Sequence, residues 1–288
     1  MRRVFVLSDP HLNLDLIEEV KPKFVGRKMT ETSVMNEFKK KTYDMSQYGL
    51  EWKNHISRLE ENWNNSVSSN DIVIIPGDIS ASKKYPKLDL TWINERPGIK
   101  ILGCGNHDKW WPSKETAKRK YEEEFKTIKF VDQHKSYIDD KIVVMGTRMC
   151  DNEYNCWPII NKQLKEETLK VSIDKTCCQV MKERLNFILN NMNEIEEDKI
   201  KILMIHHPPY NEKADINPIF EMILQSKVDI CLFGHIHTFG RFYLNENYHT
   251  FEDIQKVYPS INLLLNQKRF ICASSDLLKH SPLQILQY

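Results

Sequence analysis

The feature that most constrains this fold is a series of short apolar runs that each end in small and polar residues. The clearest run spans residues 99–108 and reads I-K-I-L-G-C-G-N-H-D. Its apolar half suits a buried strand, and Gly103 and Gly105 let the backbone turn sharply. Polar side chains after such a strand lie at the rim of a sheet, where open α/β sheets build their sites. A tight turn whose Asn and Asp bond only their own backbone is the alternative for this run alone.

Four other apolar runs end in the same way, with Asp or His directly after a predicted strand. Their tips are Asp9-Pro10-His11, Gly77-Asp78, His206-His207-Pro208 and Gly234-His235-Ile236-His237. Each tip taken alone is explained by a helix cap or a turn. However, six of the ten histidines lie at the five tips, whereas random placement would scatter them through helices and loops. The shared position therefore predicts one composite site.

Strand-like runs alternate with helical patterns in the first part of the chain. Short strands are predicted at 4–7, 72–75 and 99–102, and a helix at 52–67 has apolar residues three or four positions apart. This order predicts a parallel or mixed sheet with right-handed crossovers. Trp52 and Trp63 lie on the apolar face of that helix, where they either pack in the core or form a platform for stacking bases.

The second half continues the alternation. It predicts a hairpin over 135–146, an amphipathic helix around 178–192, and strands at 201–205 and 228–233. Since no internal repeat or linker interrupts the chain, we expect a single domain over 1–288. The segment at about 12–70 is expected to be a largely helical insert that caps the site. Such a cap would help to decide between monoester and diester substrates.

Composition limits the kinds of partner. The 41 Lys+Arg and 40 Asp+Glu give a net charge of +1, so the chain lacks the strongly basic surface typical of nucleic-acid binding. A local basic groove around 39–41 or 83–84 keeps nucleic-acid binding open as an alternative. Met1-Arg2-Arg3 leads directly into a strand, and no apolar run approaches the ~18 residues that span a membrane. We therefore expect a cytoplasmic protein without membrane contact, whose seven cysteines are reduced thiols.

The ligand types at the tips indicate which metals would fit. Two aspartates, one asparagine and four histidines offer a mixed set of oxygen and nitrogen donors. Such a set suits borderline divalent ions, whereas carboxylates alone would suit Mg²⁺ or Ca²⁺. We expect two ions, with Mn²⁺ favoured and Fe²⁺/Fe³⁺ or Zn²⁺ as alternatives. Two such ions roughly 3.5–4 Å apart form the clamp used for in-line displacement at phosphorus.

In this order, the motifs D-x-H, G-D, G-N-H-D, H-x-P and G-H-x-H resemble those of the calcineurin-like metallophosphoesterase superfamily, over residues 9–237. The stretches P-G-D-I-S and G-N-H-D-K-W-W look like a bacterial subgroup of predicted phosphohydrolases. The resemblance implies a four-layer α/β/β/α sandwich of two mixed β-sheets flanked by helices, with a dinuclear metal site at the strand ends. It also implies hydrolysis of a phosphomonoester or phosphodiester by in-line attack of a metal-bridging hydroxide.

The resemblance assigns a role to each tip residue. The first metal would be held by Asp9, His11 and His237. The second metal would be held by Asn106, His206 and His235, and Asp78 would bridge both. His107 matches the family's catalytic histidine, which is not a metal ligand and would protonate or hydrogen-bond the leaving oxygen. Asp108 matches the carboxylate that orients that histidine.

Some residues depart from the pattern or have no assigned role. Many members of the superfamily carry acidic or arginine residues just after G-D, where this chain has Ile79-Ser80-Ala81. Arg148, at the tip of its own predicted strand, is a candidate phosphate contact, with a surface or salt-bridged arginine as the alternative. His207 is a second candidate substrate contact. The segment 109–112 either walls the substrate pocket or packs under the next helix.

Three other functions compete with this interpretation. A metallo-β-lactamase-type hydrolase also uses strand-end histidines, but it concentrates them in H-x-H-x-D-H, whereas here Thr238-Phe239-Gly240 follows Gly-His-Ile-His. A nuclease or nucleic-acid phosphodiesterase on the same fold is disfavoured by the near-neutral charge. A non-catalytic scaffold of the same fold would be expected to lose ligands, and none is missing here.

Overall fold

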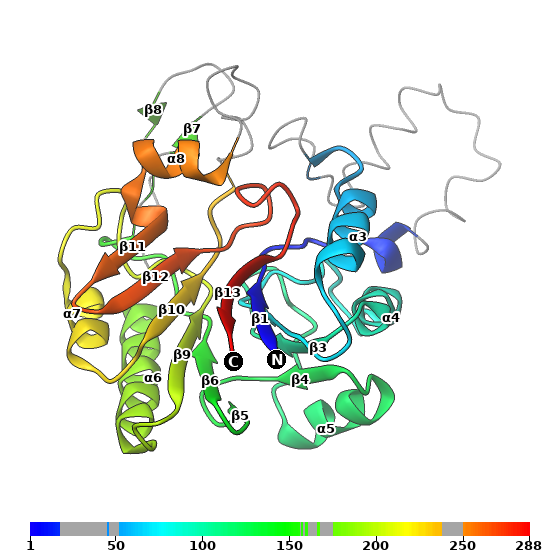
Figure 1. The fold of residues 1–288 in the computed structure, drawn as a ribbon, viewed down its shortest axis with the longest axis horizontal. Coiled ribbons are helices and arrows are strands. Elements are labelled where there is room, and N and C mark those ends of the chain that lie inside the picture. Colours follow the sequence, from blue (N-terminus) through cyan, green and yellow to red (C-terminus); the bar gives the residue numbers. More distant parts are fainter. Residues whose placement is uncertain are drawn as a thin grey trace.

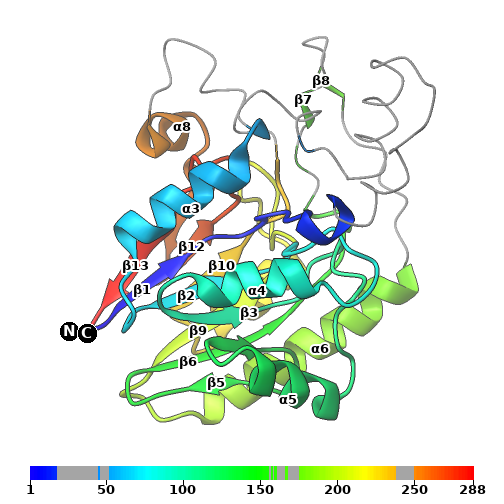
Figure 2. The same cartoon turned by 90° about the vertical axis from the view of Figure 1, so that its right-hand side faces the viewer.

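A computed structural model describes residues 1–17, 45, 52–155, 157, 159–160, 166–167, 175–237 and 250–288. Within them, two mixed β-sheets pack face to face and helices cover both outer sides (Figures 1 and 2). This arrangement confirms the expected α/β/β/α sandwich. Most of the insert expected at about 12–70 falls on 18–44 and 46–51, outside the described residues. Its capping role and the single domain over 1–288 therefore stay predictions.

The first sheet has the strand order β13-β1-β2-β3-β4. Four of its strands run parallel, namely β1 (Arg3–Val6), β2 (Ile72–Ile75), β3 (Ile99–Leu102) and β4 (Ile128–Phe130). The last strand, β13 (Leu283–Gln287), pairs antiparallel with β1 and so brings the two chain ends together (Figure 1). The outer face is covered by α3 (His55–Ser66), α4 (Lys87–Glu95) and α5 (Glu115–Glu124) (Figure 2).

The second sheet has the order β11-β12-β10-β9-β6-β5. Its parallel centre consists of β12 (Lys268–Cys272), β10 (Ile230–Phe233), β9 (Ile200–Ile205) and β6 (Ile142–Thr147). Both edges are antiparallel, formed by β11 (Asn262–Leu265) and β5 (Tyr137–Ile138). The remaining elements are α6 (Lys175–Glu194), α7 (Pro218–Gln225), α8 (Phe251–Val257), the 3₁₀ helix η4 (Pro259–Ile261), and the short hairpin of β7 (Ile159–Ile160) and β8 (Glu166–Glu167). The pairing of β5 with β6 confirms the predicted hairpin.

Central strands of the second sheet are buried on both faces. In β9, Ile202 and Met204 share a core with the first sheet, whereas Leu203 and Ile205 share one with α6 and α7. Successive strand side chains point to opposite faces. A strand between two covered faces is therefore largely apolar, with the buried Lys201 as an exception in β9. This is why mainly apolar runs marked these strands in the sequence.

Helix α3 begins at His55, within the predicted helix over 52–67. Trp63 is fully buried, and its indole Nε1 donates to the carbonyl oxygen of Pro97 over 3.0 Å. Trp52 lies just before the helix and is 2% exposed. Both tryptophans therefore pack in the interior, and the stacking-platform alternative is wrong for these two side chains.

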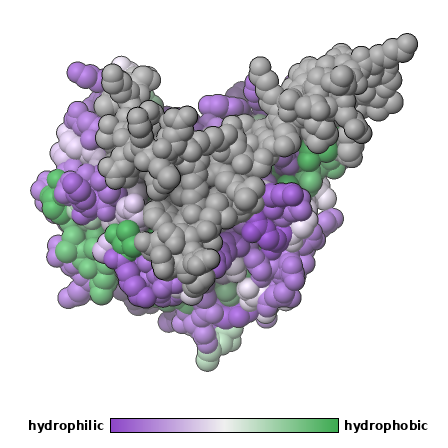
Figure 3. Space-filling model, turned by 90° about the horizontal axis from the view of Figure 1, so that it is seen from above, coloured by the Kyte–Doolittle hydropathy of each residue, from purple (hydrophilic) through white to green (hydrophobic). Residues whose placement is uncertain are grey.

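The described surface is mainly polar. Seen from above, the described residues are largely hydrophilic, with small hydrophobic areas between them (Figure 3). Among the helices in the described ranges, none combines the length and the apolar character that crossing a bilayer requires. In this view we therefore see no broad apolar face on the described residues.

The polar tips from both sheets interlock through their backbones. The amide of Asp9 donates to the carbonyl of Gly77 over 3.0 Å, which joins the tip of β1 to the tip of β2. The amide of Gly234 donates to the carbonyl of His206 over 3.0 Å, which joins the tips of β10 and β9. A third bond, from Ser8 to Ala273 over 2.7 Å, ties the first sheet to the second. Parallel strands thus deliver all five tips to one edge.

Candidate metal centre

Two strand tips and Asp78 form the first ligand cluster. Side-chain ligand atoms of Asp9, His11, Asp78 and His237 all lie within 4.8 Å of one another. The Nε2 atoms of His11 and His237 are 3.0 Å apart. Two nitrogens each bound about 2.1 Å from one ion at right angles would also be about 3.0 Å apart. This cluster therefore fits a single metal ion.

Asp78 also belongs to a second cluster, with His206 and His235. Asn106 joins it, because its Oδ1 lies 2.8 Å from Nε2 of His206 and 2.9 Å from Nδ1 of His235. The two clusters thus share one carboxylate. The seven residues proposed from the sequence as metal ligands all lie in this one place.

Four of the seven proposed ligands are buried, and some of their side-chain atoms have no hydrogen-bond partner among the described residues. Asp9, Asp78 and His206 are fully inaccessible to solvent. Among the described residues, Asp78 Oδ2 and His206 Nδ1 have no hydrogen-bond partner. The Nε2 atoms of His206 and His11 lie 3.4 and 3.7 Å from Asp78 Oδ2. Burying a carboxylate oxygen without a hydrogen bond is costly, and a divalent ion at this position would compensate for it.

The backbone at these tips adopts an unusual conformation. Four candidate ligands have positive φ: Asp9 (61°), His11 (44°), Asp78 (52°) and His235 (73°). Left-handed backbone is uncommon outside glycine, and such strain concentrates at functional sites. The glycine before one of these residues has a steric reason, because a Cβ on Gly234 would collide with the side chains of Ser8 and Asp9.

The charges of the centre are set by burial and by neighbouring groups. Burial opposes ionisation of Asp78, but the imidazoles of His206, His11 and His107 outweigh it and hold the pKa of Asp78 well below its usual range. Burial lowers the pKa of His11 well below its usual range, with His237 adding to the effect. A charged bridging carboxylate and a neutral imidazole are the forms that bind metal.

His107 differs from the ligands because its side chain is 34% exposed. Its amide donates to Asp78 Oδ1 over 2.7 Å, and its ring Nε2 lies 4.0 Å from Asp78 Oδ2. Burial is the main reason that the pKa of His107 is lowered. The ring therefore stands at the accessible side of the centre, where a substrate oxygen could reach it.

Asp108 is buried in the loop that carries His107. Its Oδ1 accepts hydrogen bonds from the amides of Ile79 and Ser80 and from Nε1 of Trp110, and its Oδ2 accepts one from the amide of Gly105. Burial, reinforced by the nearby charge of Asp78, raises the pKa of Asp108 to about 7. The bonds from Ile79 and Ser80 hold the loop after β3 against the loop after β2, and the bonds from Gly105 and Trp110 brace the loop after β3 itself. Direct orientation of the His107 ring by Asp108 stays a prediction.

His207 is buried beside the second cluster. Its Nδ1 lies 3.1 Å from the carbonyl oxygen of Arg148. A carbonyl can only accept, so Nδ1 carries the hydrogen and Nε2 carries the lone pair. That Nε2 lies 3.7 Å from Asp151 Oδ1, and the His207 and His235 rings are 4.1 Å apart between centroids. His207 therefore faces the centre, and its role as a substrate contact stays a prediction.

Two acidic residues near the centre were missed in the sequence. Asp151 Oδ1 lies 3.1 Å from Nε2 of His235, and a third group of possible ligand atoms combines Asp151, His207 and His235. Asp276 is fully buried, with Oδ1 3.8 Å from Nδ1 of His237. A carboxylate behind a ligating histidine is a usual feature of metal sites. The only available signal for Asp151 was its place three residues after the polar strand tip at Arg148.

The two tryptophans after the tip of β3 differ in their surroundings. Trp110 is 6% exposed and packs among Tyr121 and Phe130. Trp111 lines a cavity together with Arg148. Trp110 therefore packs in the core, and Trp111 lines a cavity while also packing against Phe130. A role of Trp111 in the substrate pocket stays a prediction.

Fold and site together define a class: an α/β sandwich with a buried cluster of Asp, Asn and His at the carboxyl ends of its parallel strands. The family model described as calcineurin-like phosphoesterase matches residues 2–239. The chain belongs to this family. Membership implies divalent metal ions and a phosphoester substrate, and it decides against the metallo-β-lactamase-type alternative.

Individual relatives match over limited lengths or at low identity. The Gene 66 proteins of Mycobacterium phages D29 and L5 are both 42% identical, over 66 and 55 residues. These segments are 23% and 19% of this chain and 33% and 27% of the phage proteins, so the chain spans at most a third of the curated relatives it matches.

Among solved structures, a phosphopantetheinyl hydrolase from Mycobacterium tuberculosis aligns with a TM-score of 0.44 and 11% identity, over 100% of this chain and 96% of that one. A protein of unknown function from Aquifex aeolicus aligns with a TM-score of 0.40 and 13% identity, over 99% and 96%.

Proposed function

We propose that this protein is a dinuclear metal-dependent phosphoesterase that hydrolyses a phosphomonoester or phosphodiester at the candidate metal centre. The observation that carries the proposal is the pair of buried donor clusters that share Asp78. A carboxylate common to two clusters could bind both of two ions held close together, as in two-metal sites. Family membership supports the same reaction class.

The ligands divide between two ions. The first ion would be held by Asp9, His11 and His237, the second by Asn106, His206 and His235, and both by Asp78. When bound, the ions would neutralise charge on the phosphoryl oxygens and acidify a water for in-line attack. The mixed donors favour Mn²⁺, with iron or zinc as alternatives.

The chain's own residues would handle the proton and the geometry. His107 is a partly exposed imidazole beside the centre, and it would donate a proton or hydrogen bond to the leaving oxygen, a contribution of order 10²–10⁴-fold. Its backbone bond to Asp78 fixes its position relative to the ligands. Asp108 would act as a positioning residue, because its four hydrogen bonds hold the loop on which His107 stands.

The test is hydrolysis of p-nitrophenyl phosphate and bis(p-nitrophenyl) phosphate by the purified chain. We expect one or both to be hydrolysed with Mn²⁺, the activity to disappear on chelation, and readdition of Mn²⁺ to restore it. The ratio of the two rates would separate monoesterase from diesterase. Hydrolysis of neither ester under Mn²⁺, Fe²⁺ or Zn²⁺ would favour the non-catalytic scaffold.

A further inference from the structure

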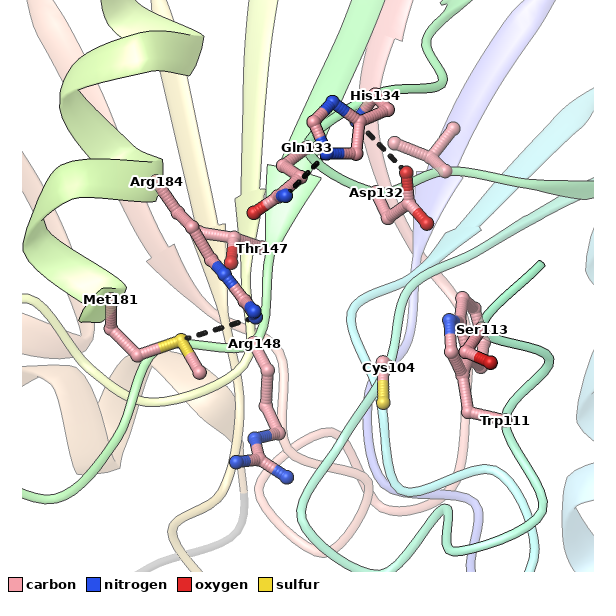
Figure 4. Close-up of a pocket in the computed structure, with 11 residues that line it drawn as sticks. Cys104, Trp111, Ser113, Asp132, Gln133, His134, Thr147, Arg148, Met181 and Arg184 are labelled. Carbon is pink, nitrogen blue, oxygen red and sulfur yellow. Dashed lines mark hydrogen bonds between the residues drawn. The ribbon is translucent and has the colours of Figure 1, made fainter. Parts of the chain in front are cut away.

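A cavity of about 290 Å³ lies outside the set of proposed metal ligands, and Figure 4 shows the residues that line it. Its walls come from the segments after β3, β4 and β6 and from helix α6. The residues that matter to its chemistry are Cys104, Trp111, Gln133, Arg148, Met181 and Arg184. The volume is at the small end of the ~300–1,000 Å³ typical of small-molecule sites. The cavity therefore suits part of a small ligand.

The cavity and the metal centre are built on the same segments. The carbonyl of Arg148 accepts hydrogen bonds from the amides of His206 and His207, over 3.3 and 3.1 Å. On the opposite wall, Cys104 lies two residues before Asn106. The segments that line the cavity therefore also carry, or bond directly to, proposed metal ligands.

Two arginines line this cavity without a carboxylate partner in the described part of the chain. Arg148 Nε is buried and has no hydrogen-bond partner among those residues. Arg184 lies on α6, exposed, and its Nη1 contacts the sulfur of Met181 at 3.9 Å, a weak acceptor. Figure 4 shows both guanidinium groups on the wall that faces Cys104, Trp111 and Ser113. The salt-bridged alternative for Arg148 therefore finds no support in the described residues.

The acid on the cavity wall does not neutralise these arginines. Asp132 forms an ion pair with Lys118, whose side chain is 3% exposed. Asp132 Oδ1 also accepts hydrogen bonds from the amides of His134 and Lys135, over 2.9 and 3.1 Å. Since arginine is always protonated in proteins, the described lining of the cavity is positively charged.

We propose that this cavity binds a second anionic group of the substrate, so that the substrate is a small phosphoester carrying another phosphate or a carboxylate. A guanidinium fork matches either anion through two parallel hydrogen bonds. Trp111 and Met181 provide apolar surface for the carbon spacer between the two anions. The inference rests on the proposed function for the scissile phosphate, and it has a binding readout of its own.

The kinetic test uses Arg184, because its exposed side chain tolerates substitution. With Mn²⁺ present, Arg184→Gln should raise the KM for 1,3-propanediol bisphosphate or 3-(phosphonooxy)propanoate by about tenfold to a hundredfold. The KM for p-nitrophenyl phosphate, which has no second anion, should change less than about twofold. Arg184→Lys should be intermediate, since it keeps the charge and loses the fork. The matched control is Arg119→Gln on α5, where the arginine is 68% exposed and lies outside the cavity lining.

Comparing the two bis-anionic esters identifies which anion the cavity binds. A higher KM of Arg184→Gln for either ester, without a matching change for p-nitrophenyl phosphate, supports the proposal. Equal KM values for wild type and Arg184→Gln with both esters would overturn it. The second readout is the affinity of the metal-free full chain for inorganic phosphate, measured by ³¹P NMR titration. We expect Arg184→Gln to weaken this binding at least about fivefold and Arg119→Gln to leave it unchanged.

The two readouts keep the proposals separate. If no ester is hydrolysed, the phosphoesterase function fails, and phosphate binding still reports on the cavity. If phosphate binds wild type and Arg184→Gln equally, the cavity proposal fails even where hydrolysis is observed.

Discussion

Replacement of Gly105 by alanine should damage the metal centre through a steric collision rather than through lost chemistry. A Cβ at this position would overlap the backbone nitrogen and Oδ1 of Asp78, the carboxylate shared by both clusters. A backbone atom cannot rotate aside, so the two loops would have to separate by roughly 1 Å. Overpacking costs about 1–3 kcal/mol, and we expect the upper part of that range here. A shift of this size at a catalytic ligand costs about 10²-fold in turnover.

Gly103→Ala provides the matched control on the same strand end. Its Cβ would meet Cε of Met204 at 2.9 Å and the carbonyl oxygen of Pro76 at 3.0 Å. The methionine side chain is flexible and can move, so we expect a loss below about 1.5 kcal/mol and unchanged Mn²⁺ affinity.

Urea denaturation measures the stability of wild type, Gly105→Ala and Gly103→Ala, and Mn²⁺ titration measures their metal affinity. Gly105→Ala should lose stability and bind Mn²⁺ at least about tenfold more weakly than wild type. If Gly105→Ala matches Gly103→Ala in both measurements, the close approach of the β2 and β3 tips does not control the site.

Three further predictions concern single side chains. His107→Ala should retain bound Mn²⁺ but lose about 10²–10⁴-fold in kcat, because the ring is not a ligand; a fully active variant refutes the assigned role. Asp151→Asn should weaken Mn²⁺ binding by about 10–100-fold, because Asp151 contacts Nε2 of His235; calorimetric titration that shows wild-type affinity would make Asp151 incidental. Burial raises the pKa of Asp89 to about 7, above its value of about 3.8 in the unfolded chain, so its protonated form favours folding. The contribution of Asp89 to stability should therefore be largest below about pH 4 and fall by up to about 4 kcal/mol as the pH rises to 7. Urea unfolding of Asp89→Asn should lack this part of the pH dependence, and a pH profile identical to that of the wild type contradicts the prediction.

The tips could be predicted from the sequence because each is a local signal. A buried strand between two covered layers is largely apolar, and it stops abruptly where small and polar residues begin, as at Leu102 and Phe233. Those boundaries predicted β1, β2, β3, β6, β9 and β10 and the position of His107 and its neighbours, whereas β4 was not predicted. The parallel arrangement then brought the tips to one edge.

Other features depend on tertiary approach and carry no local pattern. Asp151 meets His235 across 84 residues of sequence. Asp276 lies in the segment between β12 and β13, where nothing in the sequence distinguishes it from a turn aspartate. Arg184 reads as an ordinary exposed residue of an amphipathic helix, and only the packing of α6 beside β6 places it next to Arg148. The pairing of β13 with β1 likewise joins the two ends of the chain, which periodicity alone cannot indicate.

The central claim is that two metal ions share Asp78, and metal stoichiometry tests it most directly. Metal-free protein is loaded with Mn²⁺, desalted and analysed for manganese per chain. Wild type and the control Asp140→Ala, whose carboxylate is exposed on the hairpin between β5 and β6, should each retain two ions. Asp78→Ala should retain fewer than one, because both clusters lose a ligand. Two ions retained by Asp78→Ala, or a single ion in the wild type, would contradict the shared carboxylate.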